Sequence, residues 1–324
     1  MAAAGEAIAA PAGAGLSAPR SQVIAFAAML ALIGLGPFLL YPVFLMKVLC
    51  FALFASAFNL LIGFVGLLSF GHAAYFGMGS YVSAHAAKVW GLTPELAILA
   101  GAAVAAALGT AFGWLAIRRS GIYFAMITLA LAQMVFFFCL QAPFTGGEDG
   151  IQAMPRGHLL GLVALADDMT LYWVVAAIFL AGFLFLYRVV HSPFGQVLKA
   201  IRENERRAVS LGYRVDDYKL IAFVLSATLS GVAGGTKAIV FQLATLTDVN
   251  WPMSGEAVLM ALVGGIGTIF GPPVGALVII TMQNELAQLG AWVTVVQGAI
   301  FVACVLAFRR GIVGEIQALV GRPL

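Results

Sequence analysis

Residues 48–87 read VLCFALFASAFNLLIGFVGLLSFGHAAYFGMGSYVSAHAA and contain no Asp, Glu, Lys or Arg. This run is long enough for two membrane crossings, because one helical span needs about 20 apolar residues. Seven more windows are equally free of charge: 21–46, 96–117, 120–147, 169–187, 220–236, 257–284 and 286–308. The sequence therefore predicts an all-α, polytopic helical membrane protein.

The composition agrees with this fold class. Of the 324 residues, 62% are hydrophobic and 10% are charged, whereas a soluble domain is about half apolar and about a quarter charged. A soluble enzyme, a nucleic-acid-binding protein and a disordered scaffold are thereby excluded. The cysteines at 50, 139 and 304 all fall in charge-free windows, which indicates buried thiols. The pattern predicts no disulfide, cofactor or metal site.

The spans can be placed from the charges and from Pro and Gly. We predict about eight to ten transmembrane segments, drawn from the ranges 22–40, 43–64, 67–87, 96–117, 121–141, 171–188, 220–243, 256–270, 272–289 and 293–308. With the N-terminus inside, the inner loops carry thirteen cations and the outer loops carry three. Lys and Arg collect in cytoplasmic loops, so both termini are expected in the cytoplasm.

This map divides the chain into three parts. Residues 1–20 are predicted to be a disordered tail, residues 21–311 the transmembrane domain, and residues 312–324 a cytoplasmic tail. Within the domain, the long outer loop is 142–170 and the long inner loop is 188–219.

Two segments of the map are interrupted by glycine and proline. One runs from Gly63 to His72, and the other covers 256–270 and continues into Gly271-Pro272-Pro273. Such paired interruptions in the two halves of a chain indicate inverted repeats with a central substrate path. Close helix packing through small residues is the alternative, and the two interpretations are compatible.

The inner loop has the signals of an amphipathic helix outside the membrane. Ser192 and Pro193 suit the N-cap and first helical positions, and Gly212 suits the position after the last turn. The apolar stripe is interrupted at Asn204-Glu205, which could split the segment into two short helices. The helix could lie on anionic lipid or dock into a groove of a soluble partner. Its mixed charge favours the partner.

The sequence lacks the residues that several other functions would require. No Gly-Lys dipeptide occurs, so no P-loop for ATP is predicted. No Asp, Glu or Arg falls at mid-membrane depth in the span map, which disfavours a proton-driven carrier. Ser69 and His72 are three residues apart, but no third group orients the imidazole. An intramembrane enzyme, the alternative from a different class, is therefore disfavoured.

Six ordered blocks between residues 57 and 307 carry a family resemblance. They are 58–73 (FNLLIGFVGLLSFGHA), 121–130 (GIYFAMITLA), 145–150 (TGGEDG), 192–205 (SPFGQVLKAIRENE), 254–256 (SGE) and 264–272 (GGIGTIFGP). In these blocks the chain resembles the permease subunits of branched-chain amino-acid (LIV-type) ABC transporters. The block around Tyr123 and the long outer loop resemble the M-type member of the permease pair.

The resemblance implies a transport subunit without an ATPase site, in a bacterial inner membrane. The implied partners are a homologous second permease, two ATP-binding subunits and a periplasmic solute-binding protein, in addition to the lipid bilayer. Urea and short-chain amide permeases share much of the pattern, so they remain the alternative for the substrate.

Two groups of residues follow as candidate sites. In the inner loop, which the resemblance implies is the coupling helix, the residues expected to meet the ATPase are Phe194, Leu198, Ile201, Arg202, Glu203, Asn204, Glu205 and Gly212. The expected contact centres on Ile201 and Arg202. Along the path, dipoles and hydroxyls are expected near Ser69, His72, Tyr75, Tyr123, Thr128, Gly265 and Gly267.

Overall fold

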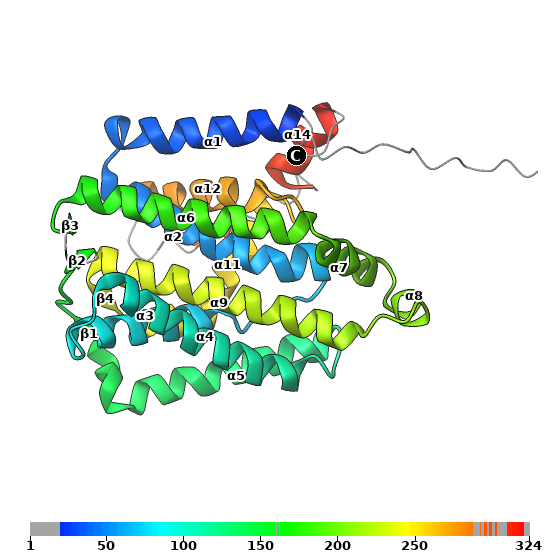
Figure 1. The fold of residues 1–324 in the computed structure, drawn as a ribbon, viewed down its shortest axis with the longest axis horizontal. Helices are drawn as coiled ribbons and strands as arrows, with labels where there is room; N and C mark the ends of the chain where they lie inside the picture. Colours follow the sequence, from blue (N-terminus) through cyan, green and yellow to red (C-terminus); the bar gives the residue numbers. More distant parts are fainter. Residues whose placement is uncertain are drawn as a thin grey trace, which may run out of the picture.

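Long helices lie side by side in one bundle, and short elements gather at its two ends (Figure 1). The computed structural model describes residues 20–159, 161, 163–287 and 310–320, together with 292, 295, 296, 298, 299 and 302. The longer helices are α1 (Arg20–Leu39), α2 (Pro42–Asn59), α3 (His72–Lys88), α4 (Pro94–Ala116), α5 (Ile122–Gln141), α6 (Asp168–His191), α9 (Val215–Phe241), α11 (Trp251–Gly264) and α12 (Gly271–Leu286). The all-α membrane fold is confirmed.

Within the described part of the chain, six helices are long and apolar enough to cross a membrane. They are Gln22–Leu39, Pro42–Val65, Pro94–Ala116, Ile122–Gln141, Asp168–His191 and Val215–Phe241. Three predicted spans, 67–87, 256–270 and 272–289, correspond to the shorter helices α3, α11 and α12, of 17, 14 and 16 residues. These are shorter because the glycine-rich segments next to them leave the helix. The predicted span 293–308 lies largely outside the described residues.

Helix α2 is at the centre of the bundle. In the most apolar 18-residue window of its span, 94% of the residues are buried inside the protein. The corresponding value for α1 is 22%. It contacts α6, α9, α11 and α12. Helices α3, α4 and α9 pack closely against one another through small residues: a Cβ on Gly79 would overlap the backbone of Gly231. Close approach of backbones through Gly and Ala is the packing typical of membrane helices.

One end of the bundle, which we call the strand end, carries the loop 142–170. It contains the 3-10 turns η2 (Pro143–Thr145) and η3 (Gly147–Asp149) and the strands β1 (Ile151–Gln152), β2 (His158–Leu159) and β3 (Val163–Ala164). β2 and β3 form an antiparallel pair, and β1 pairs antiparallel with β4 (Leu243–Ala244), with Ile151 opposite Ala244. The loop is thereby attached to the chain that follows α9.

The loop ends at the N-cap of α6. The Asp167 carboxylate accepts hydrogen bonds from the Thr170 backbone N–H and hydroxyl, both at 3.0 Å. These hydrogen bonds lower the pKa of Asp167 below its usual value. Asp167 therefore serves as the N-cap of α6.

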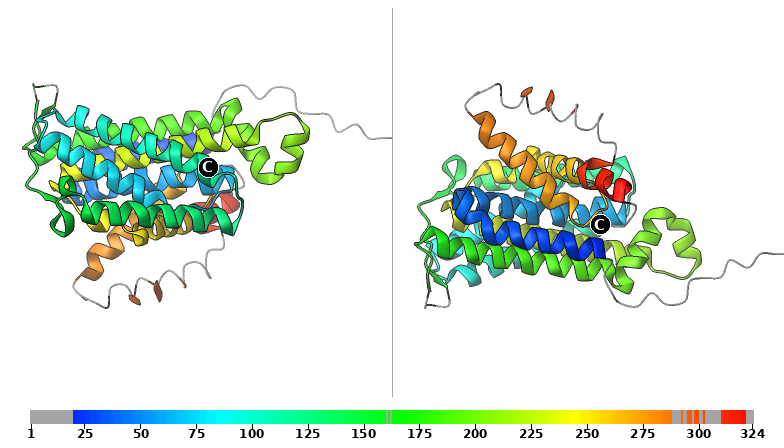
Figure 2. Two further views of the ribbon diagram at one scale, coloured as in Figure 1. Left: turned by 90° about the horizontal axis from the view of Figure 1, so that it is seen from below. Right: turned by 90° about the horizontal axis from the view of Figure 1, so that it is seen from above.

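The opposite end, which we call the α7–α8 end, carries α7 (Pro193–Glu203) and α8 (Glu205–Ser210). These two helices extend beyond the bundle in both views of Figure 2. After α10 (Leu246–Val249), the chain forms α11 and α12 before it reaches the C-terminal region. The predicted tail 312–324 contains most of α14 (Gly311–Val320), which packs on α11 and α12.

Candidate functional site

The first interruption of a helix follows α2. The chain continues as a π-helical turn, η1 (Leu60–Val65), and leaves the helix at Gly66, whose φ is +82°. Such a φ is rare for residues with a side chain, so glycine suits this position. Residues 66–71 are not helical, and α3 begins at His72. π-helical turns are rare and occur frequently at functional sites.

Three hydroxyls bind the backbone at the start of α3. The Phe70 N–H donates to Thr128 Oγ1 at 3.1 Å, and the Gly71 N–H donates to Ser69 Oγ at 3.2 Å. The Ala73 N–H donates to Ser254 Oγ of α11 at 2.8 Å. Ser69 and Thr128, which we predicted along the path, thus hold the interrupted backbone in place. The role of Ser254 was not predicted.

His72 is packed and hydrogen-bonded inside the bundle. Its Nε2 lies 2.8 Å from Ser226 Oγ, and the Ser226 hydroxyl donates to the Ala57 carbonyl at 2.5 Å. Because a hydroxyl has one proton to donate, Nε2 must carry the proton that bonds to Ser226. The Phe58 and Tyr75 rings meet the imidazole edge-on. His72 and Tyr75 are therefore part of an aromatic cluster beside the first interruption.

The second interruption separates α11 from α12. Gly265 and Gly267 have φ values of +124° and +79°, so the chain turns in conformations that favour glycine. The Thr268 hydroxyl donates to the Gly265 carbonyl at 2.8 Å and accepts from the Gly271 N–H at 3.1 Å. This turn lets α12 start at Gly271 in a new direction.

The two interruptions meet through Asn59. Its Nδ2 donates to the Thr268 carbonyl at 2.8 Å, and its Oδ1 accepts from the Gly267 N–H at 3.0 Å. The backbones are also in direct contact: a Cβ added to Gly63 would lie 2.7 Å from the Gly267 nitrogen. The side-chain amide of Asn59, which is 2% exposed, thus binds the two halves of the chain together.

Arg202 connects α7 to this contact. Its Nη1 donates to the Gly63 carbonyl. A Cβ on Gly267 would lie 3.0 Å from the same nitrogen, and a Cβ on Gly66 would lie 3.2 Å from Arg202 Cγ. We call Asn59, Gly63, Arg202, Gly267 and Thr268 the break junction. It joins α7 to both interrupted segments.

The local sequence builds α7 and α8 as predicted. Ser192 Oγ accepts from the Gly195 N–H at 3.4 Å, with Pro193 at the first helical position. Asn204 ends α7 and caps α8, since its Oδ1 accepts from the Arg207 N–H at 3.1 Å. Gly212 follows α8 with a φ of +88°. Glu205 forms an ion pair with Lys219 of α9, at 2.7 Å.

The predicted partner contact on α7 needs a correction. Leu198 and Ile201 are 0% and 3% exposed. Ile201 packs with Ala208 and Val215 in a small core of the α7–α8 end, and Phe194 is half-buried and stacks on Tyr218. These apolar residues of α7 are covered by the chain itself, so they do not form an open docking face.

The α7–α8 end exposes other residues than the buried apolar residues of α7. Arg202, Glu203, Asn204 and Glu205 are exposed, and of these Arg202 also reaches the break junction. Val209 and Leu211, which are 57% and 67% exposed, were not predicted. Their exposure depends on how α8 packs, which no short motif encodes.

The remaining predicted path residues separate into two places. Gly265 and Gly267 lie in the second interruption, and Gly267 is part of the break junction. Tyr123, at the start of α5, is 68% exposed and is not part of the aromatic cluster around His72. Across the described residues, no group of three His, Cys, Asp or Glu side chains could hold a metal ion.

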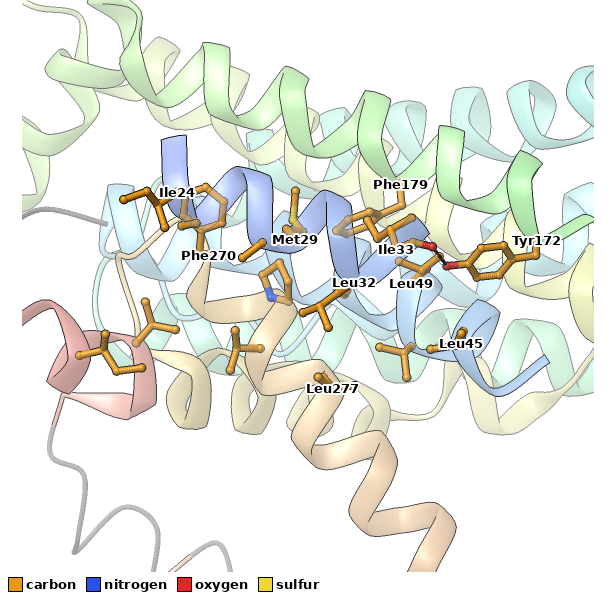
Figure 3. Close-up of a pocket in the computed structure, with 18 residues that line it drawn as sticks. Ile24, Met29, Leu32, Ile33, Leu45, Leu49, Tyr172, Phe179, Phe270 and Leu277 are labelled. Carbon is orange, nitrogen blue, oxygen red and sulfur yellow. Dashed lines mark hydrogen bonds between the residues drawn. The ribbon is translucent and has the colours of Figure 1, made fainter. Parts of the chain in front are cut away.

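A cavity of about 570 Å³ lies between α1, α2, α6, α12 and α14. Figure 3 shows its lining, which consists almost entirely of apolar side chains such as Leu32, Leu49 and Phe179. The Tyr172 hydroxyl also faces it but donates to the Ile33 carbonyl at 2.7 Å. This cavity offers an apolar occupant good contacts and gives a polar solute few.

Comparison with known proteins places the chain among transport proteins. The family model described as branched-chain amino acid transport system / permease component matches residues 41–305. The high-affinity branched-chain amino acid transport system permease protein LivM of Escherichia coli (strain K12) is 24% identical over 277 residues, which cover 78% of this chain and 65% of LivM. LivH of the same strain is 26% identical over 289 residues, covering 82% of this chain and 91% of LivH.

A sugar transporter subunit is also similar. The ribose import permease protein RbsC of Bacillus subtilis (strain 168) is 30% identical over 203 residues, which cover 56% of this chain and 58% of RbsC. The match to LivM spans less than two thirds of that relative's length. No solved structure matches the chain.

Proposed function

The chain belongs to the family of branched-chain amino acid transport permease components, and on this premise we propose that it forms half of the translocation path of an ABC importer. The other half is a homologous permease, and LivM and LivH are both similar to this chain over more than three quarters of its length. Two ATP-binding subunits and a periplasmic solute-binding protein complete the transporter. The break junction carries the proposal, because it joins α7 to both interrupted segments.

The mechanism uses α7 as the element that the ATPases move. ATP binding draws the two ATPase subunits together and displaces the α7–α8 end. Arg202 transmits this displacement to Gly63 and to the turn at Gly267. Because Asn59 also joins the two interrupted segments, they shift together, and the path opens alternately to the two sides of the membrane. The chain thus responds to ATP hydrolysed on other subunits.

The orientation of the chain follows from its charges. The α7–α8 end carries most of the inner cations, and the excess of thirteen over three supports a cytoplasmic location for it. The strand end is then periplasmic, where it faces the solute-binding protein.

Reporter fusions test this orientation. We expect a phosphatase inserted in the loop 142–170 to be active, which requires the periplasm, and a fluorescent protein inserted at 203–207 to fluoresce in the cytoplasm. The same reporters exchanged between the two sites are the control and should both be silent. Equal activity of one reporter at both sites would contradict the map.

The exposed apolar residues Val209, in α8, and Leu211, directly after it, are the proposed contact with the ATPases. We expect Leu211→Asp to remain in the membrane but to lose most of the co-purifying ATPase subunits, because a charge would replace an apolar residue in the contact. Ile201→Asp is the comparison. Because Ile201 is buried, its replacement by Asp should destabilise α7 and α8 themselves, which limited proteolysis of the loop 188–219 would detect.

Normal ATPase binding by Leu211→Asp would place the contact elsewhere. If Leu211→Asp instead becomes as sensitive to protease as Ile201→Asp, the residue supports the fold rather than the contact.

The proposed substrates are branched-chain amino acids. The names of the relatives LivM and LivH support this class, and RbsC shows that similar chains serve other solutes. Urea or a short-chain amide is the second candidate. The complex, purified with its binding protein, should show ATP hydrolysis stimulated by leucine, isoleucine or valine and unchanged by urea, acetamide or ribose. Stimulation by urea or an amide alone would reassign the substrate.

A further inference from the structure

Charged side chains gather near the strand end of the bundle, away from the break junction. Lys237 of α9 and Asp248 of α10 form a bidentate ion pair, with Nζ–Oδ1 and Nζ–Oδ2 distances of 2.8 and 2.7 Å. Their side chains are 12% and 3% exposed. Charges at this depth in a membrane protein are costly, and they usually serve a substrate or ion pathway.

Two further charges lie nearby. Lys47 of α2 interacts electrostatically with Glu256 of α11 and with Lys237. Glu256 also shares a hydrogen bond with Gln283 of α12. Both Lys47 and Glu256 are half-buried. We call Lys47, Lys237, Asp248 and Glu256 the outer charge ring.

Three members of the ring lie at similar distances from the strand-side ends of their helices. Lys47 is five residues after the start of α2, Glu256 five residues after the start of α11, and Lys237 four residues before the end of α9. At 1.5 Å per residue, each lies about 6–8 Å from the strand-side end of its helix. The four charges therefore lie near the strand end of the bundle, on the central helix α2 and on helices α9, α10 and α11.

A buried polar group interacts with Asp248. Tyr81 of α3 is 0% exposed and interacts electrostatically with Asp248. Its hydroxyl has no hydrogen-bond partner among the residues that the structure describes. A buried hydroxyl without a partner is unfavourable, so a ligand or water that reaches the Tyr81 hydroxyl would find a hydrogen-bond donor there.

The ring combines two cations and two carboxylates, so its formal charge is zero. A lone anion or a lone cation would gain from one half of the ring and be repelled by the other. A zwitterion can place its carboxylate against a Lys and its ammonium against an acidic side chain, and so gains from both halves. We propose that the outer charge ring recognises the ammonium and carboxylate groups of a zwitterionic α-amino acid as it enters the path.

This proposal rests on the proposed function, and one experiment separates the two. The complete transporter, with its binding protein, is reconstituted in liposomes, and ATP-driven uptake of radiolabelled leucine is measured. We expect Lys47→Met and Glu256→Gln each to lower leucine uptake about tenfold to a hundredfold, as the loss of one hydrogen bond to a charged group would. Assembly and basal ATP hydrolysis should be retained.

The matched control is Lys88→Met. Lys88 also lies at the strand end, but it is exposed and donates to the Gln152 carbonyl of the loop. Its replacement removes the same charge outside the ring, so uptake should stay within about twofold of the unmodified transporter.

A double variant distinguishes recognition from a structural ion pair. Replacing a buried ion pair by neutral residues is often tolerated by the fold, and Asp248→Asn keeps an acceptor for the Thr245 N–H that Asp248 now binds. We expect Lys237→Met/Asp248→Asn to assemble and yet to lose leucine uptake. If the pair only holds α9 to α10, the neutral pair should transport normally.

Each remaining outcome decides one of the two proposals. Normal leucine uptake by Lys47→Met and by Glu256→Gln overturns the proposal that the ring recognises the substrate. This holds even if the double variant fails to assemble. Absence of leucine uptake by the unmodified complex overturns the proposed substrate. Uptake of an uncharged solute in its place overturns the ring as well, because such a solute has no charges for it to bind.

Discussion

Arg202→Met is expected to abolish uptake while the transporter stays assembled in the membrane. The substitution keeps much of the aliphatic stem of Arg202 but removes the guanidinium that binds the Gly63 carbonyl. α7 then loses its hydrogen bond to the first interrupted segment, which Asn59 joins to the second. A hydrogen bond to a charged group contributes about 1.5–3 kcal/mol, so we expect uptake to fall at least about tenfold, with ATP hydrolysis no longer stimulated by the loaded binding protein.

Arg118→Met is the control for this variant. Arg118 follows α4 on the same side of the membrane, and its guanidinium lies 4.2 Å from the centre of the Trp114 ring, away from α7. Its loss removes the same charge and should leave uptake close to that of the unmodified transporter. If Arg202→Met also transports normally, the break junction does not carry the coupling.

Gly267→Leu is expected to have an effect of similar size for a steric reason. Gly267 has a φ of +79°, which costs a residue with a side chain about 1–2 kcal/mol. Its Cβ would also lie 3.0 Å from Arg202 Nη1 and 3.2 Å from the Gly63 carbonyl oxygen, and a leucine extends further. The side chain would push the two interrupted segments apart, and uptake or assembly should be lost. Gly265→Leu, at a φ of +124°, should behave in the same way.

Gly255→Leu provides the matched control. Gly255 lies in α11, the helix that ends one residue before Gly265, but a Cβ at Gly255 would meet nothing within 4 Å. The Gly255→Leu variant should assemble, as judged by the complex recovered after detergent extraction, and should transport, as judged by uptake. Wild-type behaviour of the two variants at 265 and 267 would show that this segment tolerates bulk and that the contact with Gly63 is not needed.

The sequence predicted the helices that depend on local patterns. Charge-free windows identified α1, α2, α4, α5, α6 and α9, because a membrane helix needs a long run without charges. Ser192, Asn204 and Gly212 marked the limits of α7 and α8, because caps act through neighbouring backbone groups. The start of α3 was predicted too early, because residues 67–71 are mostly apolar. In the structure, the Phe70 and Gly71 N–H groups instead bind the hydroxyls of Thr128 in α5 and of Ser69 in the segment itself.

Contacts between distant segments could not be predicted in this way. The apolar stripe through Ile201 resembles a docking face, but α8 and the start of α9 cover it within the same chain. The hydrogen bond from Arg202 to Gly63 joins residues 139 positions apart, and the bond from Asn59 to Thr268 joins residues 209 apart. Ser226 carries no local signal, since a single hydroxyl in an apolar helix gives no pattern, and the block 254–256 gave no indication that Ser254 binds the start of α3.

A covalent link between α7 and the first interruption is the most direct test of coupling through the break junction. A Cβ at residue 66 would lie 3.8 Å from the Cβ of Arg202, within the range of about 3.5–4.5 Å that a disulfide requires. In the double variant Gly66→Cys/Arg202→Cys, we expect little uptake under reducing conditions, because the guanidinium is missing. Oxidation should restore uptake by joining α7 to the interrupted segment, and reductant should abolish it again. Uptake that stays unchanged or falls when the disulfide forms would show that α7 and the interrupted segments do not move as one unit.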